Sequence, residues 1–224
     1  MSHIFANRHE AGKALADRLV RRGYVDPVVL ALPRGGVPVA AVIADALNAP
    51  LDLVLVRKIG TPGQPELALA AVVDGDEPQL VVNEDVRRYT GVSDAELEAM
   101  KARQLAEIER RRTLYLAGRA KVPVEGRTVI VVDDGIATGA TVRAALKGLR
   151  RQKPARLILA VPVAPADTLA RLRPEVDETV CLETPAPFYA IGFYYLDFTQ
   201  VDDDEVIDLL ARHGRPPAAR QQAD

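Results

Sequence analysis

The sequence is poor in the residue types on which several classes of enzyme depend. Cys181 is its single cysteine, which excludes an internal disulfide and a cysteine-based metal site. Serine occurs only at Ser2 and Ser93, and neither stands in the Gly-x-Ser-x-Gly pattern of a serine hydrolase. The histidines lie near the ends of the chain without the spacing of metal ligands. We therefore expect neither a serine hydrolase nor a histidine- or cysteine-ligated metalloenzyme.

Long apolar runs and a strong net charge are also missing. No stretch approaches the ~20 apolar residues that a membrane span needs, and the N-terminus lacks the apolar segment of a signal peptide. The net charge of −2 gives no general attraction to nucleic acid or to an anionic membrane. A cytoplasmic protein is the expectation, with no membrane partner and without nucleic acid as its main ligand.

What the sequence does contain is a regular alternation of apolar and helical segments. Its 224 residues, 48% of them hydrophobic, are enough for one domain with an ample core. Residues 28–32, 51–56, 129–132 and 156–163 are largely apolar, as in strands that are buried on both faces. Helical patterns stand between them. This alternation predicts an α/β fold with a central, mainly parallel sheet flanked by helices.

The most informative stretch runs from Thr128 to Thr141 and reads TVIVVDDGIATGAT. A buried strand ends at the paired acids Asp133 and Asp134, and a loop of small residues then leads into a helix. Loop N–H groups and the positive end of a helix can hold a phosphate. Two carboxylates can accept hydrogen bonds from ribose hydroxyls or help to hold a hydrated Mg²⁺. The lysine of a P-loop is missing, so the pattern favours a phosphorylated sugar over a nucleoside triphosphate.

This stretch resembles the phosphoribosyl pyrophosphate (PRPP) signature of the type I phosphoribosyltransferases, in which four apolar residues and two acids precede a T-G-x-T loop. The resemblance implies a Rossmann-like fold, Mg²⁺ as cofactor, and transfer of ribose 5-phosphate from PRPP to a nitrogenous acceptor. It makes Asp133 and Asp134 catalytic groups and metal ligands. The family expectation for assembly is a homodimer. The loop would bind the sugar phosphate through Gly135, Ala137, Thr138, Gly139, Ala140 and Thr141.

The turn Pro33-Arg34-Gly35-Gly36 follows the first expected strand. Two glycines permit a close backbone approach, and Arg34 supplies a permanent cation at the strand end where ligands collect in α/β sheets. In the family, a loop at this place binds pyrophosphate, often with a strained or cis peptide. The resemblance therefore assigns substrate binding to Arg34, Gly35 and Gly36, whereas a tight turn with a solvated arginine is the alternative.

A second basic turn is expected where the strand at 51–56 ends. Arg57, Lys58 and the Pro- and Gly-containing residues up to 65 resemble the loop region of adenine phosphoribosyltransferases. With few anchoring apolar contacts, this segment is expected to be mobile and to fold over a diphosphate. On that basis Arg57 would bind substrate and Lys58 would act in catalysis. An exposed basic turn between strands is the alternative.

The segment from Ser93 to Gly118 has the character of a long helix that begins with a capping box. We interpret residues 84–120 as a helical insertion within the domain. The three arginines at 110–112 suit the negative end of the helix dipole, and a solvated face is the leading explanation. A contact to RNA or to a second subunit is the weaker alternative.

Aromatic residues are concentrated near the C-terminus, in a segment at about 183–200 that we expect to form a small hood. Its sequence resembles the tail of the 6-oxopurine phosphoribosyltransferases, which places a base-stacking role on Tyr189 and a metal-binding role on Asp197. Ala137, however, stands where those enzymes carry a further acid in the loop. The branch of the family and the acceptor are therefore left open.

The domain is expected to span residues 1–214, with a flexible tail at 215–224. Two other functions compete with the transferase. One is a PRPP- or nucleotide-sensing regulatory protein with an RNA or protein partner. The other is a phosphatase or sugar-phosphate hydrolase, which is weakened because no nucleophile is evident in the sequence.

Overall fold

The computed structural model describes residues 5–75 and 77–213. The helices of more than four residues are α1 (Arg8–Val20), α2 (Gly36–Leu47), α3 (Glu84–Thr90), α4 (Asp94–Leu116), α5 (Ala140–Arg151), α6 (Ala166–Leu172) and α7 (Asp203–Arg212). The strands are β1 (Pro27–Ala31), β2 (Leu51–Leu53), β3 (Val56–Thr61), β4 (Gln64–Val73), β5 (Gln79–Val82), β6 (Thr128–Val132), β7 (Arg156–Val163) and β8 (Glu178–Glu183).

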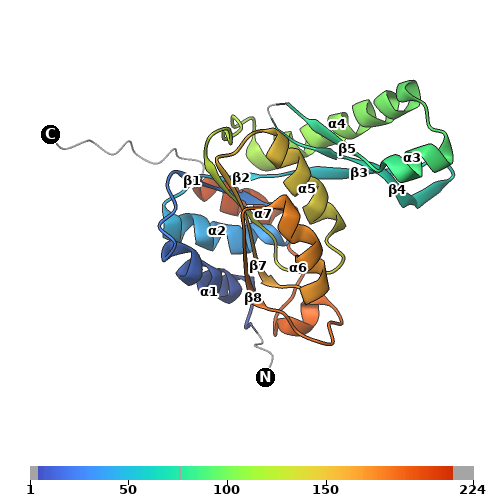
Figure 1. The fold of residues 1–224 in the computed structure, drawn as a ribbon. Coiled ribbons are helices and arrows are strands. Elements are labelled where there is room, and N and C mark those ends of the chain that lie inside the picture. Colours follow the sequence, from blue (N-terminus) through green and yellow to red (C-terminus); the bar gives the residue numbers. More distant parts are fainter. Residues whose placement is uncertain (1–4, 76, 214–224) are drawn as a thin grey trace.

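The core of the molecule is a five-stranded sheet in the order β2-β1-β6-β7-β8, in which every neighbouring pair is parallel. A second sheet of three antiparallel strands, β3-β4-β5, extends from one end of it together with α3 and α4 (Figure 1). The expected α/β fold with a central parallel sheet is confirmed. The second sheet adds an antiparallel layer that carries the long helix.

Helices cover the parallel sheet on both faces. In β6, Ile130 and Val132 belong to the core that packs against α1 and α2, while Val129 and Val131 belong to the core that packs against α5. Figure 1 shows α1 and α2 on one side of the strands and α5 and α6 on the other. Because successive side chains of a strand point to opposite faces, a strand buried on both sides has to be apolar throughout. The uninterrupted apolar run of β6 has this origin.

Side-chain caps fix the starts of three helices, including the one for which a capping box was predicted. The Asn7 side chain caps α1 by accepting a 3.0 Å hydrogen bond from the backbone N–H of Glu10. Ser93 and Glu96 form a reciprocal capping box at the start of α4. Asp202 caps α7. Such side chains satisfy N–H groups that have no partner within the helix. For this reason α1 begins directly after Asn7.

An irregular loop at 57–65 was expected, but these residues instead form most of β3, the turn and the start of β4 in a β-hairpin; the mobility of this segment stays a prediction. Ile59 pairs with Ala70, and the register shifts around Gly60. A Cβ on Gly60 would collide with the carbonyl oxygen of Pro65, so this glycine marks a bulge where two backbones meet. Gly63, with φ of +76°, forms the turn. The glycines and prolines that suggested a loop thus belong to the bulge and the turn of a hairpin.

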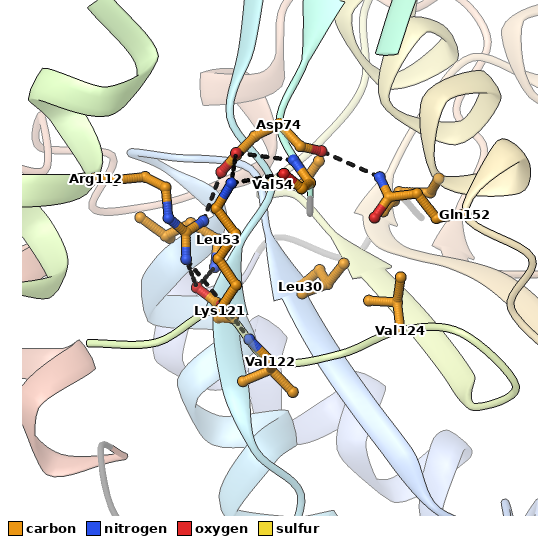
Figure 2. A pocket seen from close by; sticks show the side chains of 12 residues that line it. Leu30, Leu53, Val54, Asp74, Arg112, Lys121, Val122, Val124 and Gln152 are labelled. Carbon is orange, nitrogen blue, oxygen red and sulfur yellow. Dashed lines mark hydrogen bonds and ion pairs between the residues drawn. The ribbon is translucent and has the colours of Figure 1, made fainter. Parts of the chain in front are cut away.

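The solvated face that was expected for the arginines of α4 holds for Arg110 but is wrong for Arg112. Arg112 is only 6% exposed and forms ion pairs with the buried carboxylates of Asp52 and Asp74. Lys121 adds a 2.8 Å hydrogen bond to Asp74 (Figure 2). Burial by itself would lower the pKa of Arg112, but the two carboxylates together raise it. This charge cluster joins α4 to the main sheet through Asp52 of β2.

Within residues 5–75 and 77–213, no helix is both long and apolar enough to cross a membrane. The tail expected at 215–224 and Gly214, the last residue of the expected domain, lie outside the described residues. The division into one domain with an insertion at 84–120 stays a prediction.

Candidate functional site

The paired acids follow β6 at the carboxyl end of the parallel sheet. Asp133 is partly exposed and Asp134 is 7% exposed. The backbone N–H of Asp134 donates to Asp133 Oδ1 over 2.9 Å, and its carbonyl oxygen accepts a 2.6 Å hydrogen bond from the hydroxyl of Tyr195. The backbone that carries the two carboxylates is therefore held by β6 on one side and by the aromatic hood on the other.

The Arg-Gly-Gly turn lies directly against the acids, because β1 and β6 are parallel neighbours and end at the same edge. A Cβ on Gly35 would collide with Asp134 Oδ2, and a Cβ on Gly36 would lie 2.7 Å from the carbonyl oxygen of Val132. No larger residue fits at either place without displacement of its neighbour. The peptide bond between Pro33 and Arg34 is cis, as the family resemblance led us to expect.

Burial makes both carboxylates hard to ionise. The pKa of Asp133 is raised well above its ordinary value, first by burial and then by the nearby charge of Asp134. Its Oδ1 lies inward, against the Asp134 amide and beside Gly36. Burial also raises the pKa of Asp134, although the guanidinium of Arg8 opposes the change. A site that contains two like charges with raised pKa values is typical of a functional position, because such an arrangement costs stability.

Arg8, at the start of α1, is the main site residue that the sequence analysis missed. Its Nε lies 2.8 Å from Asp134 Oδ2, and both side chains are 11% exposed. The two residues are 126 positions apart, and nothing in the helical pattern around Arg8 marks it as different from any solvated arginine. The one signal available was the general rule that a buried acid has a cationic partner. That rule does not say which lysine or arginine of the chain is the partner.

The small-residue loop after the acids presents its polar groups to solvent. Ala137, Thr138, Ala140 and Thr141 are exposed. Gly139, with φ of +76°, precedes α5, whose N-terminus has no side-chain cap. The first N–H groups of α5 therefore lie uncapped at the positive end of a twelve-residue helix, next to the exposed residues Thr138 and Thr141. This arrangement can bind a phosphate group.

The loop is rigidly supported from behind. The N–H of Ile136 donates to the carbonyl of Val163, and the hydroxyl of Thr168 donates to the carbonyl of Ala137 over 3.0 Å. A Cβ on Gly135 would lie 2.6 Å from Ile191 of the hood, and a Cβ on Gly139 would lie 2.8 Å from Thr168. The predicted glycines thus allow the loop to pack against the hood and α6 while its other side stays open.

Three basic residues were predicted for the pyrophosphate side. Arg34 belongs to the turn whose glycines lie against the acids, but its side chain points to α7. Arg34 Nη1 lies 3.5 Å from Asp203 Oδ1. Arg57 bonds to Gln104 over 3.3 Å, and Lys58 donates to the carbonyl of Glu66 over 2.9 Å. Both lie on β3, and in the described part of the chain neither has a polar contact with Asp133 or Asp134.

The hood places Tyr189 on the surface, where it is 71% exposed and pairs with the ring of Phe193 at 5.8 Å. Asp197 accepts hydrogen bonds from the N–H and the hydroxyl of Thr199. The described residues contain no group of three or more His, Cys, Asp or Glu side chains placed to hold a metal. Asp197 is therefore not gathered into one cluster with Asp133 and Asp134 in this structure.

Comparisons with known proteins show which family the chain resembles. The family model for the phosphoribosyl transferase domain matches residues 3–197. Two curated proteins of Mycobacterium tuberculosis, provisionally named phosphoribosyl transferases, are 47% identical over 212 residues, which is 95% of this chain. The alignment covers 47% of each, so the chain spans about half the length of these relatives.

Two solved structures share the fold. The crystal structure of TT1426 from Thermus thermophilus has a TM-score of 0.82 and 44% identity, covering 93% of this chain and 98% of that chain. A hypothetical protein from Neisseria gonorrhoeae, crystallised with bound ppGpp, has a TM-score of 0.50 and 20% identity and covers 96% and 99% of the two chains. At that identity the second structure shows a common fold alone.

Proposed function

Because the chain belongs to the phosphoribosyl transferase domain family, we propose that it transfers the ribose 5-phosphate of PRPP to a nitrogenous acceptor. The observation that carries this proposal is the place where Asp133 and Asp134 meet both the exposed loop at 137–141 and the Arg34 turn. A new bond forms between the acceptor nitrogen and C1 of the ribose, and the bond from C1 to the pyrophosphate oxygen breaks. Pyrophosphate leaves with the bonding electrons.

The loop supplies the anchor for the substrate. N–H groups at the start of α5 and the hydroxyls of Thr138 and Thr141 bind the 5′-phosphate, because they are exposed and face the positive end of the helix. No bulky side chain blocks the approach of the phosphate at Gly135, Gly139 or Ala140. A fixed phosphate also fixes the ribose, and orientation of the reacting carbon lowers the barrier without any new chemical group.

The acids act on the sugar. Asp133 and Asp134 accept hydrogen bonds from the ribose hydroxyls and favour the positive charge that develops on the ring as the C1–oxygen bond breaks. Arg34 binds the pyrophosphate, with Arg57 and Lys58 assigned to the same group by the resemblance. Since Lys58 is bonded to Glu66 on the hairpin, its role in catalysis requires the β3–β4 hairpin or its own side chain to change position.

Two adjacent carboxylates fit a hydrated Mg²⁺, since this ion prefers oxygen ligands and is commonly bound by one or two carboxylates together with substrate phosphates. Asp133 and Asp134 would hold it, with Asp197 as a third ligand only after it leaves Thr199. When bound, Mg²⁺ neutralises charge on the leaving pyrophosphate.

The acceptor is a purine-like base or another nitrogenous compound. Tyr189 offers an exposed aromatic face for stacking, next to the ring of Phe193. Ala137 carries no group that could exchange a proton with the acceptor, so recognition has to come from stacking and from the hood. This favours a planar acceptor whose nitrogen is already nucleophilic.

The test is a screen of nitrogenous acceptors with PRPP and Mg²⁺, scored by pyrophosphate release. We expect release with at least one acceptor, and we expect Asp134→Asn to lower the rate about a hundredfold, which is the usual cost of losing one charge-directed contact. Asp208→Asn, at an exposed position of α7, is the matched control and should react normally. Normal turnover by Asp134→Asn would remove the centre of the proposal.

The regulatory alternative has less support. Its contact with RNA was to be the arginines at 110–112, but Arg112 is buried with Asp52 and Asp74, and Arg110 and Arg111 both pair with Glu107. Salt-sensitive binding of nucleic acid, without pyrophosphate release for any acceptor, would favour this alternative.

A further inference from the structure

Arg8 makes three separate contacts, one to an acid of the site and two to the C-terminal hood segment. Its Nε donates to Asp134 Oδ2 over 2.8 Å, and its Nη1 donates to the carbonyl oxygen of Thr199 over 2.8 Å. The guanidinium carbon lies 4.0 Å from the centre of the Phe198 ring. An arginine fixed by an acid, a carbonyl and an aromatic face has little freedom left, because its planar fork can satisfy all three only in one orientation.

These contacts connect three parts of the chain that are far apart in sequence. Arg8 begins α1, Asp134 follows β6, and residues 198–199 belong to the C-terminal hood segment. Tyr195 of the same hood bonds to the backbone carbonyl of Asp134, so both ends of this acid are tied to the hood. Oδ2 is bound to Arg8, and among the described residues no side chain donates a hydrogen bond to Oδ1. One oxygen is therefore anchored while the other stays available.

We propose that Arg8 is a positioning residue that fixes the Asp134 carboxylate for the ribose and links it to the hood segment at 198–199. This inference rests on the proposed function. Arg8 reaches the sugar only through Asp134, so its effect belongs to the orientation of that acid. The Asp134 carboxylate has to be in place as charge develops at C1. Removal of its support should therefore lower the rate of the reaction rather than the affinity for substrate.

The test compares Arg8→Gln with Arg18→Gln. Arg18 is the matched control because it lies on the same helix and donates to the backbone carbonyl of Cys181, away from the acids. For Arg8→Gln we expect kcat to fall at least about tenfold, with the KM for PRPP changing by less than about threefold. Arg18→Gln should match the wild type. Arg8→Lys, which keeps the charge but not the fork, should recover part of kcat.

A double variant separates positioning from a general loss of structure. If Arg8 acts through Asp134, Arg8→Gln should cost little further rate in an Asp134→Asn background, because residues that work as one unit are not additive. Equal losses in both backgrounds would overturn the proposal. So would wild-type kcat in Arg8→Gln. If Arg8→Gln does not fold, Arg8→Lys takes its place in both backgrounds: a loss of kcat that disappears in the Asp134→Asn background supports the proposal, and equal losses in both backgrounds overturn it.

Failure of the proposed function can be told apart from failure of this inference. If the wild type releases no pyrophosphate with any acceptor, the crystal structure of the Arg8→Gln or Arg8→Lys protein still gives an answer. A carboxylate of Asp134 rotated away from its wild-type position supports the role of Arg8. An unchanged carboxylate, with Thr199 and Phe198 also in place, overturns it.

Discussion

Asp133 is placed where its charged form is disfavoured, and this has a consequence for stability. Its pKa is raised in the folded protein, mainly by burial and further by Asp134. A carboxyl group whose pKa is higher when folded binds its proton more tightly in the folded state. The contribution of Asp133 to the free energy of unfolding is therefore highest at low pH, below the ordinary pKa of about 3.9, and falls as the pH rises through the raised value.

We therefore predict that Asp133→Asn is more stable than the wild type at pH 7 and that this advantage disappears towards pH 4. Each unit by which the pKa is raised corresponds to about 1.4 kcal/mol. Urea denaturation at a series of pH values, without added Mg²⁺, measures the effect. Asp17→Asn, at an exposed position of α1, is the control for the removal of one surface carboxylate. A variant that is less stable than the wild type at pH 7 would contradict this interpretation of Asp133.

The sequence predicted the site residues that are neighbours along the chain and missed those that are far apart in it. Asp133, Asp134 and the loop up to Thr141 are consecutive, so their chemistry is visible as one pattern. Arg8 and Tyr195 contact Asp134 from 126 and 61 positions away. Their partnership exists only after the sheet, α1 and the hood have assembled. Contacts of that kind leave no local pattern in a single sequence.

The helices and strands carry a second prediction, which concerns how α4 is attached. Arg112 lies about two turns of α4 beyond Leu105 and pairs with Asp52 and Asp74, which are 2% and 3% exposed. Its removal leaves buried carboxylates with fewer partners. Breaking such a pair typically costs about 3–5 kcal/mol, whereas an exposed ion pair contributes about 1 kcal/mol at most.

We therefore predict that Arg112→Ala lowers the free energy of unfolding by about 3 kcal/mol or more. Arg110→Ala removes an exposed pair with Glu107 on the same helix and should cost much less than this. Denaturation in urea compares the two variants directly. Similar losses for both would mean that Arg112 behaves as a surface residue, against its 6% exposure and its contact with Asp74 in Figure 2.

The sequence predicted a helix or strand correctly where a single local signal determines it. It failed where the packing of distant segments opposes that signal. The capping box of Ser93 and Glu96 marks the start of α4, and it forms as expected. At 57–65, glycine and proline indicate a break, but the register of β3 with β4 absorbs them in a bulge and a turn. Likewise, Arg110 and Arg112 are both cationic residues of α4. Only the packing of α4 on the buried acids makes their surroundings differ.

The whole molecule is organised so that separate segments end at one edge of the parallel sheet. β1 leads into the Arg34 turn and β6 into the acids, and the two strands are neighbours. Ligands in open α/β sheets collect at this edge, which is why the fold and the place of the site could be expected together. The order of the outer strands and the three-stranded sheet that carries α4 could not, because they depend on how distant segments pair.

The central claim is that PRPP docks at this edge with its phosphate on the loop at 137–141 and its ribose on the paired acids. The most direct measurement is a crystal structure of the protein with PRPP and Mg²⁺. We predict the 5′-phosphate within hydrogen-bond distance of the N–H groups at the start of α5, and the ribose hydroxyls at Asp133 and Asp134. PRPP bound elsewhere, with the loop empty and both acids turned away from the sugar, would contradict the account.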